Sequence, residues 1–147
     1  MLTEETGDLV EFWRRGNAIG ITTNGFVKNN GECVMGRGIA LSINRAIPGF
    51  AKELGDRIVC YGNVPQWFPE HRIWTFPVKH NWWEPADIDL IKQSAFLIKQ
   101  RSAGYLDYLD FPRPGCGNGK LAWPSVKKEI EPIFRDVEAH VWDFGAK

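Results

Sequence analysis

The sequence predicts one α/β domain, and three observations lead to this prediction. The apolar pattern switches several times along the chain between the two-residue period of strands and the 3.6-residue period of helices. The 147 residues suit a domain that buries roughly two-thirds of its unfolded surface, so no disulfide or metal is needed for stability. The sequence contains no internal repeat, low-complexity tract or linker. We therefore expect residues 1–147 to form a single domain.

Strands are expected where short apolar runs are bounded by turn-forming residues. The first is the run from Ala18 to Thr23, which leads into a polar segment rich in glycine. Further strands are predicted, in chain order, at residues 57–61, 72–76, 105–111 and 139–144.

Helices are expected where apolar residues share one helical face. Ile39, Ile43 and Ile47 recur every four residues, and the following Pro48-Gly49 pair breaks or bends that helix. Residues 86–101 carry an apolar stripe opposite a polar face, which predicts a helix lying on a sheet. A last helix is predicted to begin at Pro124, because proline suits the first helical position, and to end before Ala139.

Charge and cysteine content exclude several classes of protein. The chain has 18 Lys and Arg and 18 Asp and Glu, and this zero net charge argues against binding nucleic acid by charge alone. Cys33, Cys60 and Cys116 form neither a disulfide framework nor a CxxC half-site, which favours a reducing compartment. We find no signal peptide and no membrane-spanning run, so a cytoplasmic location is expected.

Glycines concentrate in two segments, each between a predicted strand and a predicted helix. We call residues 25–39 the first glycine loop and residues 113–122 the second. Backbone N–H groups in such loops converge on an anion, and the N-terminus of the following helix adds partial positive charge. One such loop could be an ordinary turn, but two in equivalent positions favour a diphosphate site. Neither has the spacing of a P-loop or of GxGxxG, so a site of another kind is predicted.

Four motifs, TTNG, CVMGRGIA, FPVKHNWW and PRPGCGNGKLAW, together resemble the macrodomain family. The resemblance spans about residues 6–144. It is specifically to the branch of DNA ADP-ribosyl glycohydrolases and the terminal ADP-ribose protein glycohydrolase. It implies a three-layer α/β/α domain with a mixed, mostly parallel sheet and an ADP-ribose cleft at one edge of the sheet.

The resemblance also implies roles for individual residues. Asp8 matches an acidic residue that accepts a hydrogen bond from the adenine amine, and Phe144 matches a position that packs near adenine. Asn24 matches an asparagine near the distal ribose, where we expect a part in catalysis. The implied contacts with the diphosphate and the riboses come from Met35, Gly36, Arg37, Gly38 and Ile39 in the first loop and from Gly115, Cys116, Gly117, Asn118, Gly119 and Lys120 in the second.

Lys79 is the implied catalytic residue. In this branch a lysine in an FPxK context attacks or stabilises the anomeric carbon of the distal ribose. An amine attacks only when it has lost its proton, and burial among apolar groups promotes that loss. The aromatic residues on both sides of Lys79 in the sequence favour a desolvated position. Without the resemblance, a solvated lysine at a strand end is the simpler interpretation.

Gly119 departs from one member of this branch. The protein glycohydrolase pairs its lysine with an aspartate in the second loop, and Gly119 stands at the matching position here. The DNA-directed glycohydrolases also have glycine there, so the departure favours a DNA-linked substrate over a protein-linked one. The first loop is also longer than in the family pattern, by residues 26–32.

Other candidates are weighed against simpler roles. His80 could assist proton transfer, but adjacent residues on a strand point to opposite faces. His71 and His140 are expected at the surface. Cys116 is interpreted as a packing residue and not as an activated thiol. Trp82 and Trp83 are adjacent and hard to bury together, so we expect at least one of them to line the cleft or to stack on a base.

The predicted function is an ADP-ribose-binding hydrolase that removes ADP-ribose from nucleic acid, or from a related conjugate, through Lys79. Two alternatives stay open: a phosphatase acting on ADP-ribose 1″-phosphate, and a non-catalytic reader of ADP-ribose. Expected partners are ADP-ribose and its conjugates, DNA included, with no membrane, cofactor or metal; the chain is expected to be a monomer. At zero net charge, a DNA substrate would be recognised through its ADP-ribose group, with weak salt dependence.

Overall fold

In the computed structural model, which describes residues 1–144, helices and strands alternate along the chain. Their order is β1 (Leu2–Thr6), α1 (Leu9–Arg14), β2 (Ile19–Asn24), α2 (Gly38–Ala46), α3 (Phe50–Tyr61), β3 (Trp67–Phe68), β4 (Ile73–Lys79), α4 (Ile88–Ser102), β5 (Leu109–Pro112), α5 (Trp123–Ile130) and β6 (Ala139–Asp143). The predicted α/β fold class is confirmed.

The strands form a mixed, mostly parallel sheet. β6 lies between β1 and β5 and is parallel to both, and β4 lies between a parallel β2 and an antiparallel β3. The two groups adjoin where β2 contacts β5, which gives the order β1-β6-β5-β2-β4-β3. Lys79 at the end of β4 donates a hydrogen bond to Asn118 in the loop that follows β5, so the carboxyl ends of the two groups meet at one edge of the sheet. This edge is where ligands bind in open α/β sheets.

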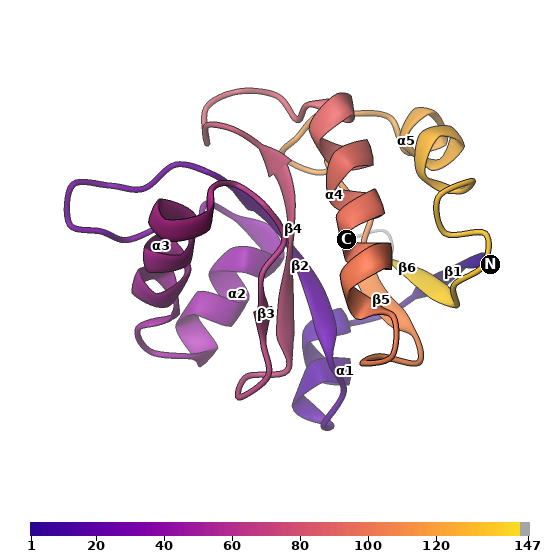
Figure 1. Cartoon of the computed structure of the whole chain (residues 1–147), viewed down its shortest axis with the longest axis horizontal. Coiled ribbons are helices and arrows are strands. Elements are labelled where there is room, and N and C mark those ends of the chain that lie inside the picture. Colours follow the sequence, from indigo (N-terminus) through magenta and orange to yellow (C-terminus); the bar gives the residue numbers. More distant parts are fainter. Residues whose placement is uncertain (145–147) are drawn as a thin grey trace.

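Helices cover both faces of this sheet, as Figure 1 shows: α1, α2 and α3 lie on one side, and α4 and α5 lie on the other. Alternation along the strands explains the two cores. Ile19 and Ile21 of β2 pack with α1, α2 and α3, whereas Phe76 and Val78 of β4 pack with α4 and α5. The three layers expected from the resemblance are present.

The strand predicted at residues 57–61 is wrong, because these residues form the last turns of α3. The β-branched pair Ile58-Val59 resembles a strand in isolation, yet Val59 is 73% exposed. The helix is instead positioned by its first half, where Phe50, Ala51 and Leu54 are buried on one face. Tertiary packing thus overrides the local β preference.

The other predicted elements are found with shifted ends. The strand expected at residues 105–111 is present only as β5, because Gly104 has a φ of +83° and residues 105–108 are not extended into the sheet. α5 begins at Trp123, one residue before the predicted start. β1, α1, β3 and the helix α3 were not predicted: β3 has two residues, and α1 has six.

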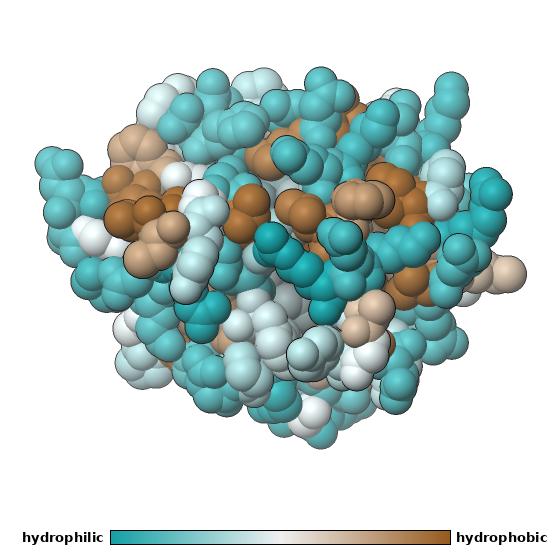
Figure 2. All heavy atoms as spheres, in the orientation of Figure 1, coloured by the Kyte–Doolittle hydropathy of each residue, from teal (hydrophilic) through white to brown (hydrophobic). Residues whose placement is uncertain are grey.

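The surface in Figure 2 is mostly hydrophilic on the face that it shows, with separate hydrophobic areas over α3 and beside α4. No helix within residues 1–144 is long and apolar enough to cross a membrane.

Candidate functional site

The carboxyl ends of β2 and β4 bring Asn24 and Lys79 side by side. The two residues are paired in the parallel ladder, immediately after an irregularity in register between Thr23 and Asn24. Lys79 is the last residue of β4, and its carbonyl oxygen accepts hydrogen bonds from Gly25 N at 3.1 Å and Asn63 Nδ2 at 2.9 Å. The backbone at Lys79 is therefore fixed, so that the side chain is directed from a rigid strand end.

The Lys79 ammonium group contacts the loops on either side of it. Nζ donates to the Asn118 carbonyl in the second glycine loop at 3.2 Å and to the Trp82 carbonyl at 3.3 Å. Within residues 1–144, no carboxylate lies within ion-pair distance of Nζ. Partial burial lowers the pKa of Lys79, and the positive charge of Lys120 lowers it further. The amine is thus easier to deprotonate than an ordinary lysine.

Asn24 uses both ends of its amide to shape the first glycine loop. Nδ2 donates to the Val34 carbonyl at 2.8 Å, and Oδ1 accepts from the Phe26 N–H at 2.9 Å. The side chain is 8% exposed. These bonds close the base of the loop, so they give Asn24 a positioning role; its predicted part in catalysis stays a prediction.

The first glycine loop extends from the sheet as a hairpin before it returns to α2 (Figure 1). The extra residues 26–32 form its tip, where Lys28 N donates to the Glu32 carbonyl and Val27 pairs with Cys33. Met35 is then buried, while Gly36, Arg37 and Gly38 are exposed. α2 begins there without a side-chain cap, which leaves its first N–H groups available to an anion.

The second glycine loop folds back on itself between β5 and α5. Leu121 N donates to the Gly115 carbonyl at 2.9 Å, and Lys120 N donates to the Gly117 carbonyl at 3.0 Å. Gly117, Asn118 and Lys120 are exposed. α5, like α2, begins without a side-chain cap. Both loops therefore present polar backbone at the start of a helix, as the sequence predicts.

Gly119 is the position that the resemblance matches to an aspartate, and the fold leaves no space there for a side chain. A Cβ atom at Gly119 would lie 2.4 Å from the carbonyl oxygen of Gly115. Because the obstructing atom belongs to the backbone, the whole loop would have to move. Gly119 itself also holds the loop in place, since its carbonyl accepts from Ala86 N at 3.0 Å.

A cavity of about 660 Å³ lies between α1 and α2, and Asp8, Gly38, Ile39 and Phe144 are among its lining residues. These four residues come from distant parts of the sequence, and each was predicted to bind the ligand. Asp8 also caps α1: its Oδ1 atom accepts from Glu11 N at 3.1 Å. The resemblance thus brought together residues that no local pattern connects.

The sequence prediction did not include three charged residues that line the same cavity: Glu11 and Arg14 of α1 and Arg45 of α2. Their positions within short amphipathic helices resemble ordinary exposed faces, so the sequence contains no signal that singles them out. They place both signs of charge around the cavity.

The remaining candidates have structural partners. His80 Nε2 lies 3.0 Å from Asp87 Oδ2, and Asp87 caps α4. His71 and His140, which were expected at the surface, are partly buried there: His71 lies 3.1 Å from Glu53, and His140 Nδ1 lies 2.8 Å from Asp110.

Burial raises the pKa of Cys116 to about 11, which fits its predicted packing role. Glu53, Glu70 and His71 lie close enough together to hold a metal ion, and His71 Nε2 lies 3.1 Å from Glu53 and 3.8 Å from Glu70.

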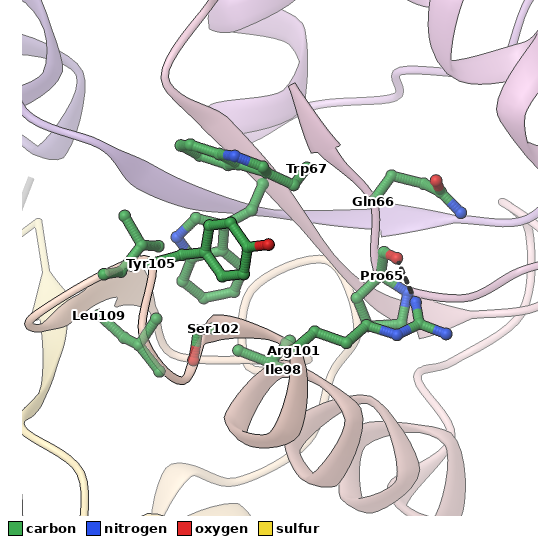
Figure 3. A pocket seen from close by; sticks show the side chains of 10 residues that line it. Pro65, Gln66, Trp67, Ile98, Arg101, Ser102, Tyr105 and Leu109 are labelled. Atoms are coloured by element: carbon green, nitrogen blue, oxygen red, sulfur yellow. Dashed lines mark hydrogen bonds between the residues drawn. The ribbon is translucent and has the colours of Figure 1, made fainter. Parts of the chain in front are cut away.

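A second cavity, of about 280 Å³, lies near the opposite end of β4, between the last turn of α4 and β3. Figure 3 shows the side chains of Trp67, Tyr105 and Leu109 around it and the hydrogen bond of 2.8 Å from Arg101 to the Pro65 carbonyl. Trp74 also lines it, and the buried Nε1 of Trp74 has no hydrogen-bond partner within residues 1–144. None of the predicted site residues contributes to this cavity.

The fold and site define a class: a three-layer α/β/α protein with two glycine loops and a strand-end lysine at the carboxyl edge of its sheet. Comparison with known proteins narrows this class. No family model matches the sequence. Over 141 residues the chain is 30% identical to the DNA ADP-ribosyl glycohydrolase of Thermus aquaticus, an alignment that covers 87% of this chain. The chain spans only 39% of the length of that relative.

Solved structures show the same fold. The macrodomain of Mycobacterium tuberculosis DarG matches with a TM-score of 0.72 and 24% identity, covering 97% of each chain. The macrodomain of Thermus aquaticus DarG matches with a TM-score of 0.68 and 25% identity, covering 99% of each. Thermosipho africanus DarTG in complex with ADP-ribose matches with a TM-score of 0.74 and 20% identity, covering 96% of this chain and 41% of that one. The chain belongs to the macrodomain family, and these relatives are of the DarG type.

Proposed function

We propose that this macrodomain binds ADP-ribose and hydrolyses the bond that links ADP-ribose to a base of DNA. The observation that carries the proposal is the position of Lys79: its amine lies at the end of β4, against the second glycine loop, with a lowered pKa and no carboxylate partner within residues 1–144. The similarity to a relative named DNA ADP-ribosyl glycohydrolase supports the same reaction.

Each part of ADP-ribose has a proposed place. Adenine enters the cavity between α1 and α2, where Asp8 Oδ2 has no donor within residues 1–144 and can accept from the adenine amine. The diphosphate lies between the two glycine loops, on the uncapped starts of α2 and α5. The distal ribose then lies near the paired ends of β2 and β4, next to Asn24 and Lys79.

Two roles for Lys79 fit this arrangement. As a nucleophile, the neutral amine forms a bond to the anomeric carbon while the bond to the base breaks with its electron pair, and the base takes up a proton. Water then releases ADP-ribose and restores the amine. As an electrostatic catalyst, the protonated amine instead stabilises the negative charge that develops on the departing base, while water attacks the anomeric carbon, the bond to the base breaks with its electron pair, and the base takes up a proton. The lowered pKa favours the nucleophilic role, because a larger fraction of the amine is then neutral.

Gly119 favours DNA as the leaving partner over protein. No carboxylate can stand at this position without moving the second loop, so the acid that assists protein-linked chemistry in the related enzyme has no place. Exposed His80, held by Asp87, is the nearest titratable residue in sequence to Lys79 and remains a candidate for proton transfer.

The direct test is turnover of a DNA oligonucleotide that carries ADP-ribose on one base, with the wild-type protein and with Lys79→Ala. We expect wild type to release ADP-ribose and the variant to lose this activity while it still binds free ADP-ribose in calorimetry. Equal turnover by both proteins would remove Lys79 from the mechanism. Binding of ADP-ribose without any turnover would indicate a non-catalytic reader. Turnover of ADP-ribose 1″-phosphate, with phosphate released and no action on the modified DNA, would indicate a phosphatase.

A further inference from the structure

Three aromatic rings from two separate segments meet next to Lys79. The rings of Trp82 and Trp83 lie with centroids 5.6 Å apart and nearly perpendicular, and Phe26 meets Trp83 edge-on at 5.4 Å. We call Phe26, Trp82 and Trp83 the aromatic surface. Phe26 comes from the extra residues of the first glycine loop, so this extension of the loop builds one end of the surface.

The aromatic surface is held open to solvent by a tight turn. The Glu84 side chain accepts from the Asn81 N–H at 3.1 Å and from Asn81 Nδ2 at 2.8 Å, and Glu84 N donates back to the Asn81 carbonyl at 3.2 Å. Trp82 and Trp83 occupy the two central positions of this turn and are 51% and 58% exposed. Folding therefore does not use these indoles for the core, although each could bury a large apolar area.

The surface is continuous with the proposed reaction centre. The Trp82 carbonyl is one of the two acceptors of the Lys79 amine, and the other is Asn118 of the second glycine loop. A group attached to the distal ribose must leave the site at Lys79, so it emerges beside these rings. The aromatic side chains are therefore placed to contact and recognise that group.

We propose that the aromatic surface stacks on bases of a single-stranded nucleic acid, at and beside the base that carries ADP-ribose. This inference rests on the proposed function. Exposed indoles bind every base through its π-face without reading sequence. The zero net charge supplies no general attraction to phosphates, and stacking is a source of affinity beyond ADP-ribose that does not depend on net charge. A base within a duplex has both faces covered, which makes the single strand the preferred substrate.

The test compares a single-stranded oligonucleotide bearing one ADP-ribosylated base with free ADP-ribose. For the double variant Trp82→Ala/Trp83→Ala, we expect KM for the oligonucleotide to rise about 5- to 150-fold, the loss typical of one missing stacking interaction. We expect kcat to change little and the Kd for free ADP-ribose to stay within about twofold of wild type. The variant Trp82→Phe/Trp83→Phe should recover most of the loss, because a phenyl ring still stacks.

Tyr105→Ala is the matched control, since this residue is 79% exposed and lies at the other cavity. Its KM should equal that of wild type. An unchanged KM in the double alanine variant, or an equal loss of affinity for free ADP-ribose, would overturn the inference. The inference would also be overturned if the double alanine variant raised KM for an ADP-ribosylated peptide as much as for the oligonucleotide, because the surface would then fit a polypeptide.

Binding separates this inference from the proposed function. If wild type binds the modified oligonucleotide without turnover, the proposed hydrolysis fails, and fluorescence anisotropy still tests the aromatic surface. Weaker binding of the double alanine variant, at an unchanged Kd for free ADP-ribose, would then support stacking. Equal binding by both proteins, or no binding by either, would overturn it.

Discussion

Strand β4 contributes to two regions of very different character. Near its beginning, Trp74 lines the apolar cavity beside α4; at its end, Lys79 reaches the second glycine loop. The apolar cavity is bounded mainly by aromatic and aliphatic side chains (Figure 3), whereas the cavity between α1 and α2 is lined by charged residues and by the first glycine loop. The lysine end has exposed backbone, two uncapped helix starts and an amine with a lowered pKa.

The difference shows that a binding site needs polar groups that can still form bonds, whereas an apolar cavity needs only packed side chains. At the Lys79 end of β4, the exposed backbone N–H groups and the amine can still form hydrogen bonds with a ligand. The Trp74 end is packed mainly by aromatic rings, such as Trp74 against Phe111 at 5.7 Å, although the buried Nε1 of Trp74 has no hydrogen-bond partner within residues 1–144. We therefore expect mutations at the Lys79 end to change binding and turnover, and mutations at the Trp74 end to change stability.

Lys79→Ala should have the largest effect. Loss of the amine removes the only side chain proposed to act on the anomeric carbon, so kcat should fall by about 10²–10⁴-fold, the range typical of a positioned catalytic group. The Kd for ADP-ribose should change little. Single-turnover assays on modified DNA measure the first quantity, and calorimetry measures the second. Arg101→Ala, at the other cavity, is the control; a fall in kcat of similar size there would erase the distinction between the two ends.

Trp74→Ala should reverse this pattern. The side chain is 4% exposed, and its removal leaves a large void, so the free energy of unfolding should fall by about 3–5 kcal/mol. At a temperature where the variant is folded, turnover should match that of wild type. Urea denaturation gives the stability, and Tyr105→Ala, with an exposed ring, should cost less than about 0.5 kcal/mol. A Trp74 variant that is stable but inactive would connect the apolar cavity to the reaction.

Gly119→Ala should damage the second loop through its backbone. The added Cβ must move the Gly115 carbonyl, and the Kd for ADP-ribose should rise about tenfold or more as the loop loses its shape. The melting temperature should also fall. In the same loop, Gly117→Ala has open space around its Cβ and should leave the melting temperature unchanged. Equal melting temperatures for the two variants would show that the loop is not under this constraint.

Lys120→Gln should have the smallest effect, a shift in pH dependence. The charge of Lys120 lowers the pKa of Lys79, so removing it raises that pKa. If neutral Lys79 is the nucleophile, kcat rises with pH through this pKa, and the rise should move to higher pH in the variant. If protonated Lys79 is the catalyst, kcat falls with pH through the pKa instead. Profiles of kcat against pH at saturating substrate decide between the two roles. An unmoved profile would show that the charge of Lys120 does not affect the titration that controls kcat.

The sequence predicted the fold class and the two glycine loops because both depend on local signals. Apolar periodicity located α2 and α4, and strand–glycine–helix order located the loops. It failed at residues 57–61, where local β preference and tertiary packing disagree. α1 and β1 were missed because they are short, and β1 has mostly exposed side chains.

The site was predictable only in part. Lys79 and Asp8 were identified through resemblance, since nothing in their local sequence distinguishes them from a solvated lysine or an ordinary helix cap. The exposure of Trp82 and Trp83 was foreseeable from their adjacency. The contact of Phe26 with Trp83 was not, because it joins loops that are separated by two helices and two strands.

The contact between Gly119 and the Gly115 carbonyl also limits how this domain can evolve. A single codon change to aspartate at position 119 would introduce a carboxylate and distort the loop that holds the ligand in the same step. A lineage could acquire an acid there only after the second loop had first been rebuilt. Two members of one family that differ at this position are thus separated by a barrier in the backbone, and not by one substitution.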